Sequence, residues 1–243
     1  MILAAGRGER MRPLTDHCPK PLLLVRGKAL IDWHIEALML GGFNNVVINT
    51  AWLGEQFAPH FSAQHDRQIR LQPNDLRREQ LSISYSHEGI DFSGALETAG
   101  GIARALPLLG QVFWVLAGDV YTPGFEFTQA AVERFTASGK LAHLWLVHNP
   151  PHHLTGDFGI DADGRALNVL ADTAQPRYTF STIALYRKSF FDGLPFGNPE
   201  GIKAALAPML RAAMHKRQIS AELYPGLWTD VGTPQRLAQL NLN

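Results

Sequence analysis

The feature that most constrains the fold is a regular alternation of short apolar runs with longer segments of helical spacing. The runs that we interpret as strands are Met1–Ala4, Val46–Ile48, Leu81–Tyr85, Val112–Ala117 and Ala142–Val147. Apolar residues at helical spacing fill the stretches between them, at Leu30–Leu40, Leu53–Phe61, Thr98–Leu109 and Phe127–Ser138. This strand–helix–strand rhythm predicts an α/β protein with a mostly parallel sheet and helices on both of its faces.

The pattern changes in the second half of the chain. Phe158–Ile160 and Ala166–Leu170 flank the turn-forming residues 161–164 and predict a β-hairpin. Further elements are expected as a strand at Thr179–Tyr186, a helix at Glu200–Arg217 and a late strand at Trp228–Val231. The polar stretch Arg67–Gln80 is expected to be an exposed excursion. Because no long linker divides the chain, we expect one domain, residues 1–243, with the second half forming a small antiparallel lid.

Bulk composition limits the classes of partner. The 243 residues carry a formal net charge of 0, so there is no general bias toward nucleic acid or membrane surfaces. Cys18 is the only cysteine, which excludes an internal disulfide framework. The N-terminus lacks a signal-peptide pattern, and no apolar run reaches the roughly 18 residues of a spanning helix. A soluble cytoplasmic protein is therefore expected, with no nucleic-acid or membrane partner.

A glycine- and arginine-rich loop, Gly6–Met11, follows the first apolar run. It does not fit the dinucleotide-binding pattern, because Met11 stands in place of the third glycine, and no Walker Gly-Lys-Ser/Thr is present. Its glycines nevertheless allow backbone N–H groups to approach an anion, and several cations accompany them. Those cations are Arg7, Arg10, Arg12 and Lys20. These residues alone leave two interpretations open, a phosphate-binding loop and a solvated basic turn.

Two aspartates follow predicted strands. Asp119 comes directly after Val112–Ala117 and Gly118, and Asp230 closes the late strand. Carboxylates at the carboxyl ends of parallel strands lie where open α/β sheets bind ligands, and two of them can share Mg²⁺ with substrate phosphates. The alternatives are a turn residue for Asp119 and a helix-capping residue for Asp230.

The longer motif around the glycine-rich loop resembles the signature of the sugar-1-phosphate nucleotidyltransferases. It runs Leu3-Ala4-Ala5-Gly6-x-Gly8-x-Arg10-Met11-x-Pro13-Leu14-Thr15 and continues as Pro19-Lys20-Pro21-Leu22. Later segments occur in the family's order: Gly41-Gly42, Leu96–Gly101, Gly118-Asp119 and Trp228–Thr233. The resemblance covers nearly the whole chain and implies a Rossmann-like three-layer sandwich of the nucleotide-diphospho-sugar transferase type.

The resemblance also implies roles for individual residues. The nucleotide-binding half would be residues 1–140 and the sugar-binding half residues 141–243. The implied catalytic residues are Arg10, Lys20 and Asp119. The implied nucleotide-binding residues are Leu3, Ala4, Gly6, Arg7, Gly8, Lys20, Gly89 and Gly101. Asn149 and Asp157 would bind the sugar, and Asp119 and Asp230 would hold Mg²⁺. The implied partners are UTP, or another nucleoside triphosphate, and a sugar-1-phosphate.

A short subgroup of this family resembles the chain most, the N-acetylmuramate-1-phosphate uridylyltransferases of peptidoglycan recycling. The shared motifs are Asn149–His153, Gly156–Phe158 and Phe180–Ile183. The chain lacks a sugar-phosphate lysine found in many relatives, for which Arg177 is a weak replacement, and residues 67–80 and 90–93 are inserted relative to this subgroup. Alternatives are a mannose-1-phosphate guanylyltransferase, a glucose-1-phosphate uridylyltransferase and a non-catalytic nucleotide-sugar sensor.

Three further features have simple interpretations. Trp33 lies at helical spacing and is expected in the core rather than as a stacking platform. His152 and His153 could contribute to a metal site, but a loop histidine pair without a spaced carboxylate or cysteine is expected to be solvated. The oligomeric state stays open between a monomer and a small homo-oligomer.

Overall fold

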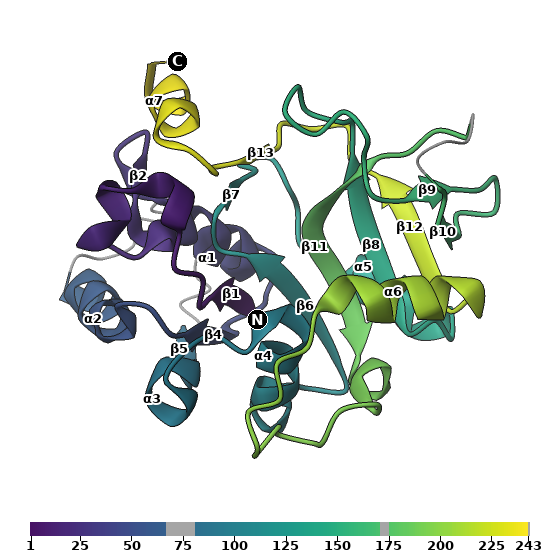
Figure 1. Ribbon diagram of the computed structural model, residues 1–243, viewed down its shortest axis with the longest axis horizontal. Coiled ribbons are helices and arrows are strands. Elements are labelled where there is room, and N and C mark those ends of the chain that lie inside the picture. The colour runs from purple at the N-terminus through teal and green to yellow at the C-terminus, as the bar shows by residue number, and fades with distance from the viewer. Residues whose placement is uncertain (67–80, 171–174, 243) are drawn as a thin grey trace.

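A seven-stranded sheet forms the centre of the computed structural model, which describes residues 1–66, 81–170 and 175–242 (Figure 1). Its strand order is β12-β8-β11-β6-β1-β4-β5. The strands are β1 (Ile2–Ala4), β4 (Asn45–Thr50), β5 (Ser82–His87), β6 (Val112–Ala117), β8 (Ala142–Val147), β11 (Thr179–Arg187) and β12 (Ile219–Leu223). Strand β11 runs antiparallel to both neighbours, whereas the other paired strands of this sheet are parallel. The predicted excursion at residues 67–80 lies outside the described residues.

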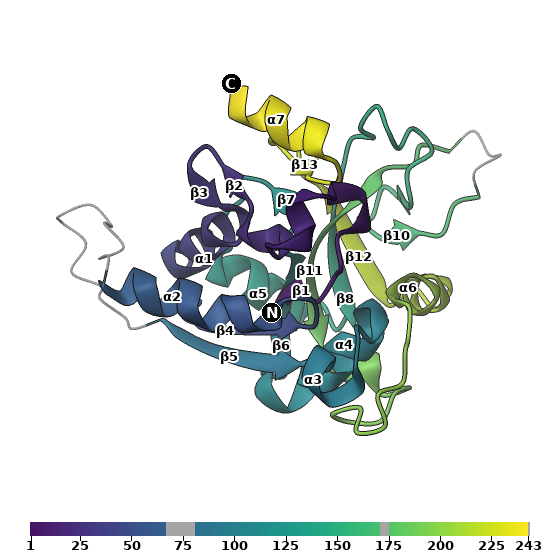
Figure 2. The same ribbon diagram turned by 60° about the vertical axis from the view of Figure 1, so that its left-hand side comes forward.

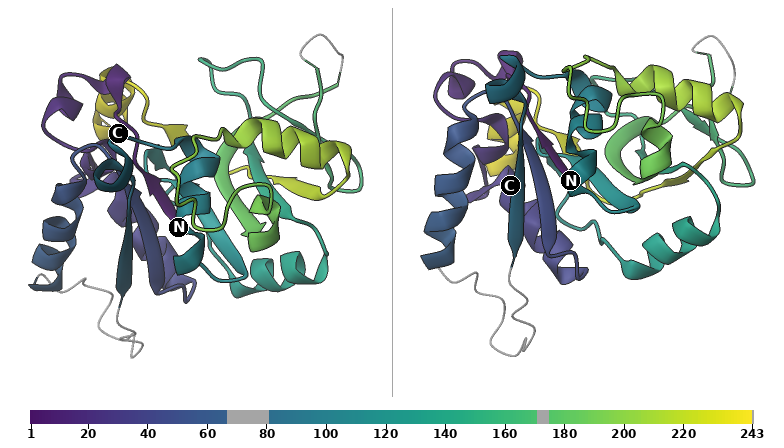
Figure 3. Two further views of the ribbon diagram at one scale, coloured as in Figure 1. Left: turned by 60° about the horizontal axis from the view of Figure 1, so that its bottom comes forward. Right: turned by 90° about the horizontal axis from the view of Figure 1, so that it is seen from below.

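Helices cover both faces of the sheet (Figure 3). Helices α4 (Glu97–Ala105) and α6 (Leu206–His215) pack on one face, and α1 (Leu30–Leu40), α2 (Phe57–Asp66) and α5 (Gln129–Ala137) contribute to the core on the other. Strand β6 supplies both cores because its side chains alternate: Phe113 and Val115 face α4 and α6, while Trp114 and Leu116 face the opposite side. The predicted three-layer α/β class with a mostly parallel mixed sheet is therefore confirmed.

Small antiparallel sheets surround the strand ends. Strands β9 (Gly159–Ile160) and β10 (Ala166–Leu167) form the predicted hairpin, and the Asp161 carboxylate accepts hydrogen bonds from the backbone N–H groups of Asp163 and Arg165. Figure 2 shows α6 next to β12 and close to β10. The other two pairs are β7 (Val120–Tyr121) with β13 (Thr229–Asp230) and β2 (Leu24–Val25) with β3 (Lys28–Ala29).

The remaining helices are α3 (Glu88–Phe92), directly after β5, and α7 (Pro234–Leu242), which packs against β2. Trp33 is partly buried and packs against the core, with its ring 5.3 Å from that of Tyr121 in an edge-on contact. Within the described ranges, no helix combines the length and the apolar character needed to cross a membrane.

One predicted helix is shorter in the structure, and one strand of the central sheet was not predicted. The helix expected over Glu200–Arg217 occupies only Leu206–His215. Gly201 has a φ of +67°, and the backbone of Ala204 instead bonds with Leu96, Ala99 and Gly100 around the start of α4. Tertiary pairing therefore replaces the first turns of the expected helix. Strand β12 was not predicted, because its five residues are a short alternating segment directly after a helix.

Candidate active site

A cavity of about 790 Å³ opens at the carboxyl ends of β1 and β6. Eight of the residues implied by the family motifs line it: Leu3, Ala4, Gly6, Gly8, Arg10, Lys20, Asp119 and Asp157. The cavity lies at the edge of the sheet where open α/β folds bind ligands. The structure thus brings together residues that are up to 154 positions apart in the sequence.

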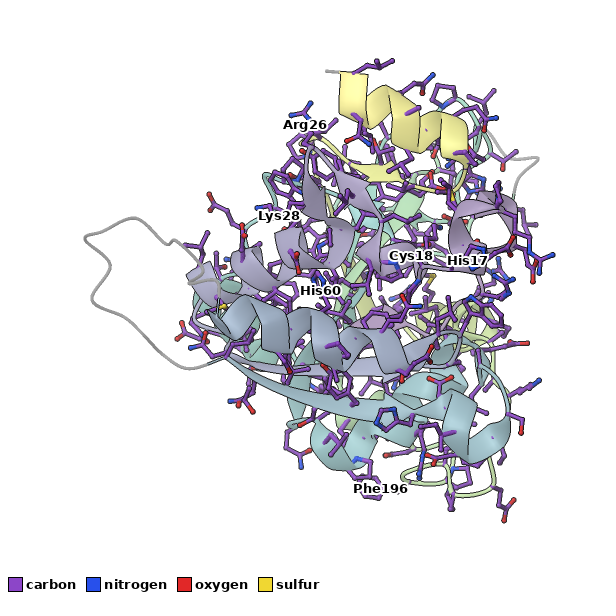
Figure 4. All side chains as sticks on the ribbon, turned by 90° about the vertical axis from the view of Figure 1, so that its left-hand side faces the viewer. His17, Cys18, Arg26, Lys28, His60 and Phe196 are labelled. Carbon is purple, nitrogen blue, oxygen red and sulfur yellow. The ribbon has the colours of Figure 1, made fainter. Side chains whose placement is uncertain are left out.

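The glycine-rich loop is fixed by buried side chains rather than by a third glycine. Gly8 has a φ of +68°, and its carbonyl accepts a 2.8 Å hydrogen bond from the Thr15 hydroxyl. Met11 is fully buried in an apolar cluster with Leu30 and Tyr121. This packing explains why a methionine stands where the dinucleotide motif has glycine, since its side chain anchors the loop to the core. His17 and Cys18, which are labelled in Figure 4, lie between this loop and Lys20.

Lys20 and Asp119 form an ion pair at the cavity wall. The Lys20 Nζ lies 2.5 Å from Asp119 Oδ2, and Lys20 is only 8% exposed. Gly118 lets β6 approach β1 closely: its N–H donates to the Leu3 carbonyl, and a Cβ at this position would lie 3.1 Å from that oxygen. The pair therefore has a well-determined position between the loop and the end of β6.

His34 supports the residues beside Asp119 from within the core. Its Nε2 lies 2.9 Å from the Val120 carbonyl oxygen, and its side chain is buried. Burial lowers the pKa of His34 to about 4, against smaller raising effects of the Val120 hydrogen bond and the Asp119 charge. The imidazole is therefore neutral near pH 7, and its Nε2–H is the atom that donates to Val120.

Strand pairing brings the backbone of Asp230 next to that of Asp119. It pairs with Val120 across the β7–β13 ladder, and the Val231 N–H donates to the Asp119 carbonyl at 2.9 Å. One carboxylate oxygen, Oδ1, contacts His152 Nε2 at 2.6 Å and also Arg236. The other oxygen, Oδ2, lies 2.9 Å from the position of a Cβ on Gly232, a residue that lines the cavity. Asp230 itself does not line the cavity, whereas Asp119 does.

The side chains of Asp119 and Asp230 carry the oxygen ligands that magnesium prefers. Magnesium usually binds through one or two carboxylates together with substrate phosphates and water. Among the described residues, no group of three or more His, Cys, Asp or Glu side chains could hold a metal by itself. Asp230 on β13 and Asp119 in the turn just before β7 provide two carboxylates from neighbouring segments.

Glu88 and Asn49 line the cavity but were not singled out from the sequence. The Asn49 side chain accepts a hydrogen bond from the Ala4 N–H at 2.9 Å and donates one to Glu88 Oε1 at 2.6 Å. The Leu96 N–H donates to the other Glu88 oxygen at 2.7 Å. Burial raises the pKa of Glu88, although both hydrogen bonds act in the opposite direction. Glu88 directly follows β5 as observed, whereas the predicted strand ended at Tyr85, so only a correct strand end could have identified Glu88 from the sequence.

Three of the residues expected to bind nucleotide lie outside the cavity lining and instead support it. A Cβ on Gly101 would lie 2.4 Å from Glu88 Oε1, and one on Gly89 would lie 2.6 Å from the Ala51 carbonyl oxygen. These glycines allow α3 and α4 to approach the sheet. Arg7 lies 3.6 Å above the Trp52 ring and donates to the Thr15 carbonyl, which fixes the outer part of the glycine-rich loop.

On the opposite side of the cavity, the structure separates the two residues expected to bind sugar. Asp157 lines the cavity, and its carboxylate accepts a 2.8 Å bond from the Phe180 N–H and contacts His153. Asn149 does not line it; its amide donates to the carbonyls of Leu154 and Arg177 and so fastens the loop that carries Asp157. His152 and His153 each contact a carboxylate, so neither is simply solvated as the sequence indicated.

Two of the described non-glycine residues with a positive φ line this cavity. Glu97 and Thr182 both line it, and they adopt φ angles of +60° and +69° although neither is glycine. Thr182 lies where the register of β11 against β8 shifts between Phe180 and Ala184. Such strain persists only where the surrounding structure enforces it, and it clusters at functional sites.

Comparison of the sequence and the fold with known proteins identifies the family of this chain. The family model described as nucleotidyl transferase matches residues 1–243. The chain therefore belongs to the nucleotidyl transferase family, and the resemblance seen in the sequence motifs is confirmed.

Within this family, one relative is an N-acetylmuramate alpha-1-phosphate uridylyltransferase from Neisseria meningitidis serogroup B. It is 46% identical over 98% of this chain and 95% of its own length. A protein of the same name from Caulobacter vibrioides is 30% identical over 97% of this chain and 92% of its own. A crystal structure of a proposed glucose-1-phosphate thymidylyltransferase from Bacillus anthracis, in complex with sucrose, matches with a TM-score of 0.75. Because it shares 20% identity over 99% of this chain and 92% of its own, that likeness concerns the fold.

Proposed function

We propose that this protein transfers a uridylyl group from UTP to N-acetylmuramic acid 1-phosphate, which yields a UDP-sugar and pyrophosphate for peptidoglycan recycling. The observation that carries the proposal is one continuous cavity that extends from the glycine-rich loop past Lys20 and Asp119 to Asp157. Its volume of about 790 Å³ lies within the range of about 300–1,000 Å³ typical of ligand pockets. The two uridylyltransferase relatives support the choice of base and sugar.

The proposed chemistry is a direct in-line displacement at the α-phosphorus. A phosphate oxygen of the sugar-1-phosphate forms the new bond to this phosphorus, and the bond to the bridging oxygen of pyrophosphate breaks. Arg10 would hold the leaving pyrophosphate, and Lys20 would stabilise charge on the α-phosphate. Asp119 and Asp230 would hold Mg²⁺, which when bound supplies neutralising charge to the phosphates. No protein nucleophile is required, so positioning and charge dominate catalysis.

The nucleotide would lie along the first half of the chain, residues 1–140. Backbone groups of Leu3, Ala4, Gly6 and Gly8 would approach the triphosphate and nucleoside. The Glu88 carboxylate is a fitting partner for the base, because a carboxylate oxygen can accept a hydrogen bond from the N3–H of uracil. Gly89, Gly101 and Arg7 would then act by shaping this wall, as their contacts indicate.

The sugar would lie against the second half, residues 141–243, which together with the first half forms one catalytic domain. Asp157 is the proposed sugar-binding carboxylate, and Asn149 would position its loop. We propose that the protein acts in the cytoplasm as a monomer or small homo-oligomer, without nucleic-acid or membrane partners. Arg177, which donates to the Asp157 carbonyl, would support the same loop.

A matrix of pyrophosphate-release assays tests the proposal. UTP, GTP, ATP and dTTP are each combined with the 1-phosphates of N-acetylmuramic acid, N-acetylglucosamine, glucose and mannose, with magnesium present. We expect the highest kcat/KM with UTP and N-acetylmuramic acid 1-phosphate. Faster turnover with GTP and mannose phosphate, or with UTP and glucose phosphate, would favour one of the alternative transferases. Binding without pyrophosphate release in every combination would favour a non-catalytic sensor.

A further inference from the structure

The cavity continues into an apolar recess between α6 and the central sheet. Its walls there are Val115 and Phe158 on one side and Leu206 and Leu210 on the helix. These residues belong to the core cluster on the α4 and α6 face of the sheet. The recess is therefore apolar, whereas the cavity wall near the glycine-rich loop carries polar and charged groups. Figure 1 shows α6 and the loop after β1, in purple, on different sides of the molecule.

One unpartnered hydroxyl lies in this apolar recess. Tyr186 on β11 is fully buried and lines the cavity, and its hydroxyl has no hydrogen-bond partner in the described part of the chain. Burial raises the pKa of Tyr186 well above its usual value, so the hydroxyl remains a neutral donor. A buried hydroxyl without a protein partner is costly, so the Tyr186 hydroxyl is available to donate to an oxygen of a ligand that enters the recess.

Arg211 is a cation that α6 contributes to the same cavity. It follows Leu210 on the helix and lines the cavity, far from Arg10 and Lys20 in the chain. Within residues 1–66, 81–170 and 175–242, no hydrogen bond or ion pair of its guanidinium occurs. The carboxylate of Asp157, which also lines the cavity, forms no ion pair with Arg211 and contacts the Phe180 N–H and His153. Arg211 is thus an exposed cation at the cavity wall that is free to bind an anionic group of a ligand.

We propose that Arg211 recognises the carboxylate of the lactyl ether on the sugar substrate and so selects acidic sugar phosphates over neutral ones. The inference rests on the proposed function. N-acetylmuramic acid differs from N-acetylglucosamine by this lactyl group alone, which combines an apolar methyl with a carboxylate. The apolar walls suit the methyl group, and a guanidinium can bind a carboxylate through two parallel hydrogen bonds. Arg10 and Lys20 would bind the phosphates of the substrates, so Arg211 is not needed for that role.

The decisive measurement is the ratio of kcat/KM for N-acetylmuramic acid 1-phosphate to that for N-acetylglucosamine 1-phosphate, with UTP. We compare the wild type with Arg211→Met and Arg211→Lys, and we use Lys216→Met as the matched control. Lys216 is an exposed cation at the end of the same helix and does not line the cavity. A third substrate, the lactyl carboxamide of N-acetylmuramic acid 1-phosphate, removes the charge but keeps the size.

We expect the ratio to fall about 10- to 100-fold in Arg211→Met, the range for loss of a charge-assisted hydrogen bond. Arg211→Lys should recover part of it, and Lys216→Met should keep the wild-type ratio. The wild type should discriminate against the carboxamide, and Arg211→Met should lose most of that discrimination. A parallel loss with both sugar phosphates, or an unchanged ratio, would overturn the inference while the proposed function stands. A wild-type ratio near one would instead overturn the proposed function and the inference with it.

Discussion

Replacement of Lys20 by methionine is the sharpest test of the site, because activity and stability should respond differently. The Lys20 ammonium lies 2.5 Å from Asp119 Oδ2 and is nearly buried, whereas the Asp119 side chain is 37% exposed. Loss of one preorganised charge at a reacting phosphate typically lowers the rate about 10²- to 10³-fold, which equals about 3–4 kcal/mol of transition-state stabilisation. The free energy of unfolding should fall by at most about 1 kcal/mol, since water can hydrate the remaining carboxylate.

The assay is pyrophosphate release at saturating UTP and sugar phosphate, with thermal unfolding measured on the same sample. Lys28→Met is the matched control, because Lys28 Nζ also lies 2.5 Å from a carboxylate oxygen, that of Glu36, but does not line the cavity. Lys28 lies on the β2–β3 hairpin together with Arg26 (Figure 4). Lys28→Met should retain wild-type turnover. If folded Lys20→Met keeps turnover within about threefold of the wild type, the role assigned to Lys20 is wrong.

Three further perturbations test other parts of the structure. Gly101→Ala would place a Cβ 2.4 Å from Glu88 Oε1, so we expect a higher KM for UTP and a loss of about 1–3 kcal/mol in stability; an unchanged KM would separate Glu88 from base binding. Chelation of divalent ions should abolish pyrophosphate release, and added Mg²⁺ should restore it; turnover that persists in chelator would argue against a metal on Asp119 and Asp230. His34 has a pKa lowered to about 4 from 6.5, so its stabilising contribution is complete above pH 6.5 and is lost as the pH falls toward 4, by up to about 3 kcal/mol. Urea unfolding of His34→Gln should therefore depend less on pH between 6.5 and 4.5 than that of the wild type, and equal slopes would contradict this linkage.

The fold could be predicted in detail where one periodicity dominates. The alternating runs from β1 to β8 gave the parallel part of the sheet, because each strand is flanked by a helix of regular apolar spacing. The start of α6 could not be predicted in the same way. Residues 201–205 have helical composition, but the Ala204 backbone forms its hydrogen bonds with the start of α4, which is distant in the sequence.

The candidate site shows the same limit. The positions of motif residues in the sequence identified cavity-lining residues such as Arg10, in the glycine-rich loop, and Lys20, in the motif that follows it. They did not distinguish a lining residue from one that supports the wall, as with Gly101 and Asn149, because this depends on side-chain packing between separate elements. Glu88 and Arg211 were not identified, since single charged residues acquire significance only when the fold brings them to the cavity.

The position of β11 has a consequence for how the chain could be divided or recombined. Although it follows residue 140, this strand lies between β6 and β8, with Ala184 opposite both Val115 and Leu144. A polypeptide cut after residue 140 would leave β6 with an unpaired edge, and the remaining fragment would present β11 without its partner. Chimaeras that exchange the second half with a relative must therefore match an interior strand on both of its sides. On the proposed location of the sugar, new sugar preferences are more readily introduced by replacement of the loop that carries Asp157, or of α6, than by exchange of whole halves.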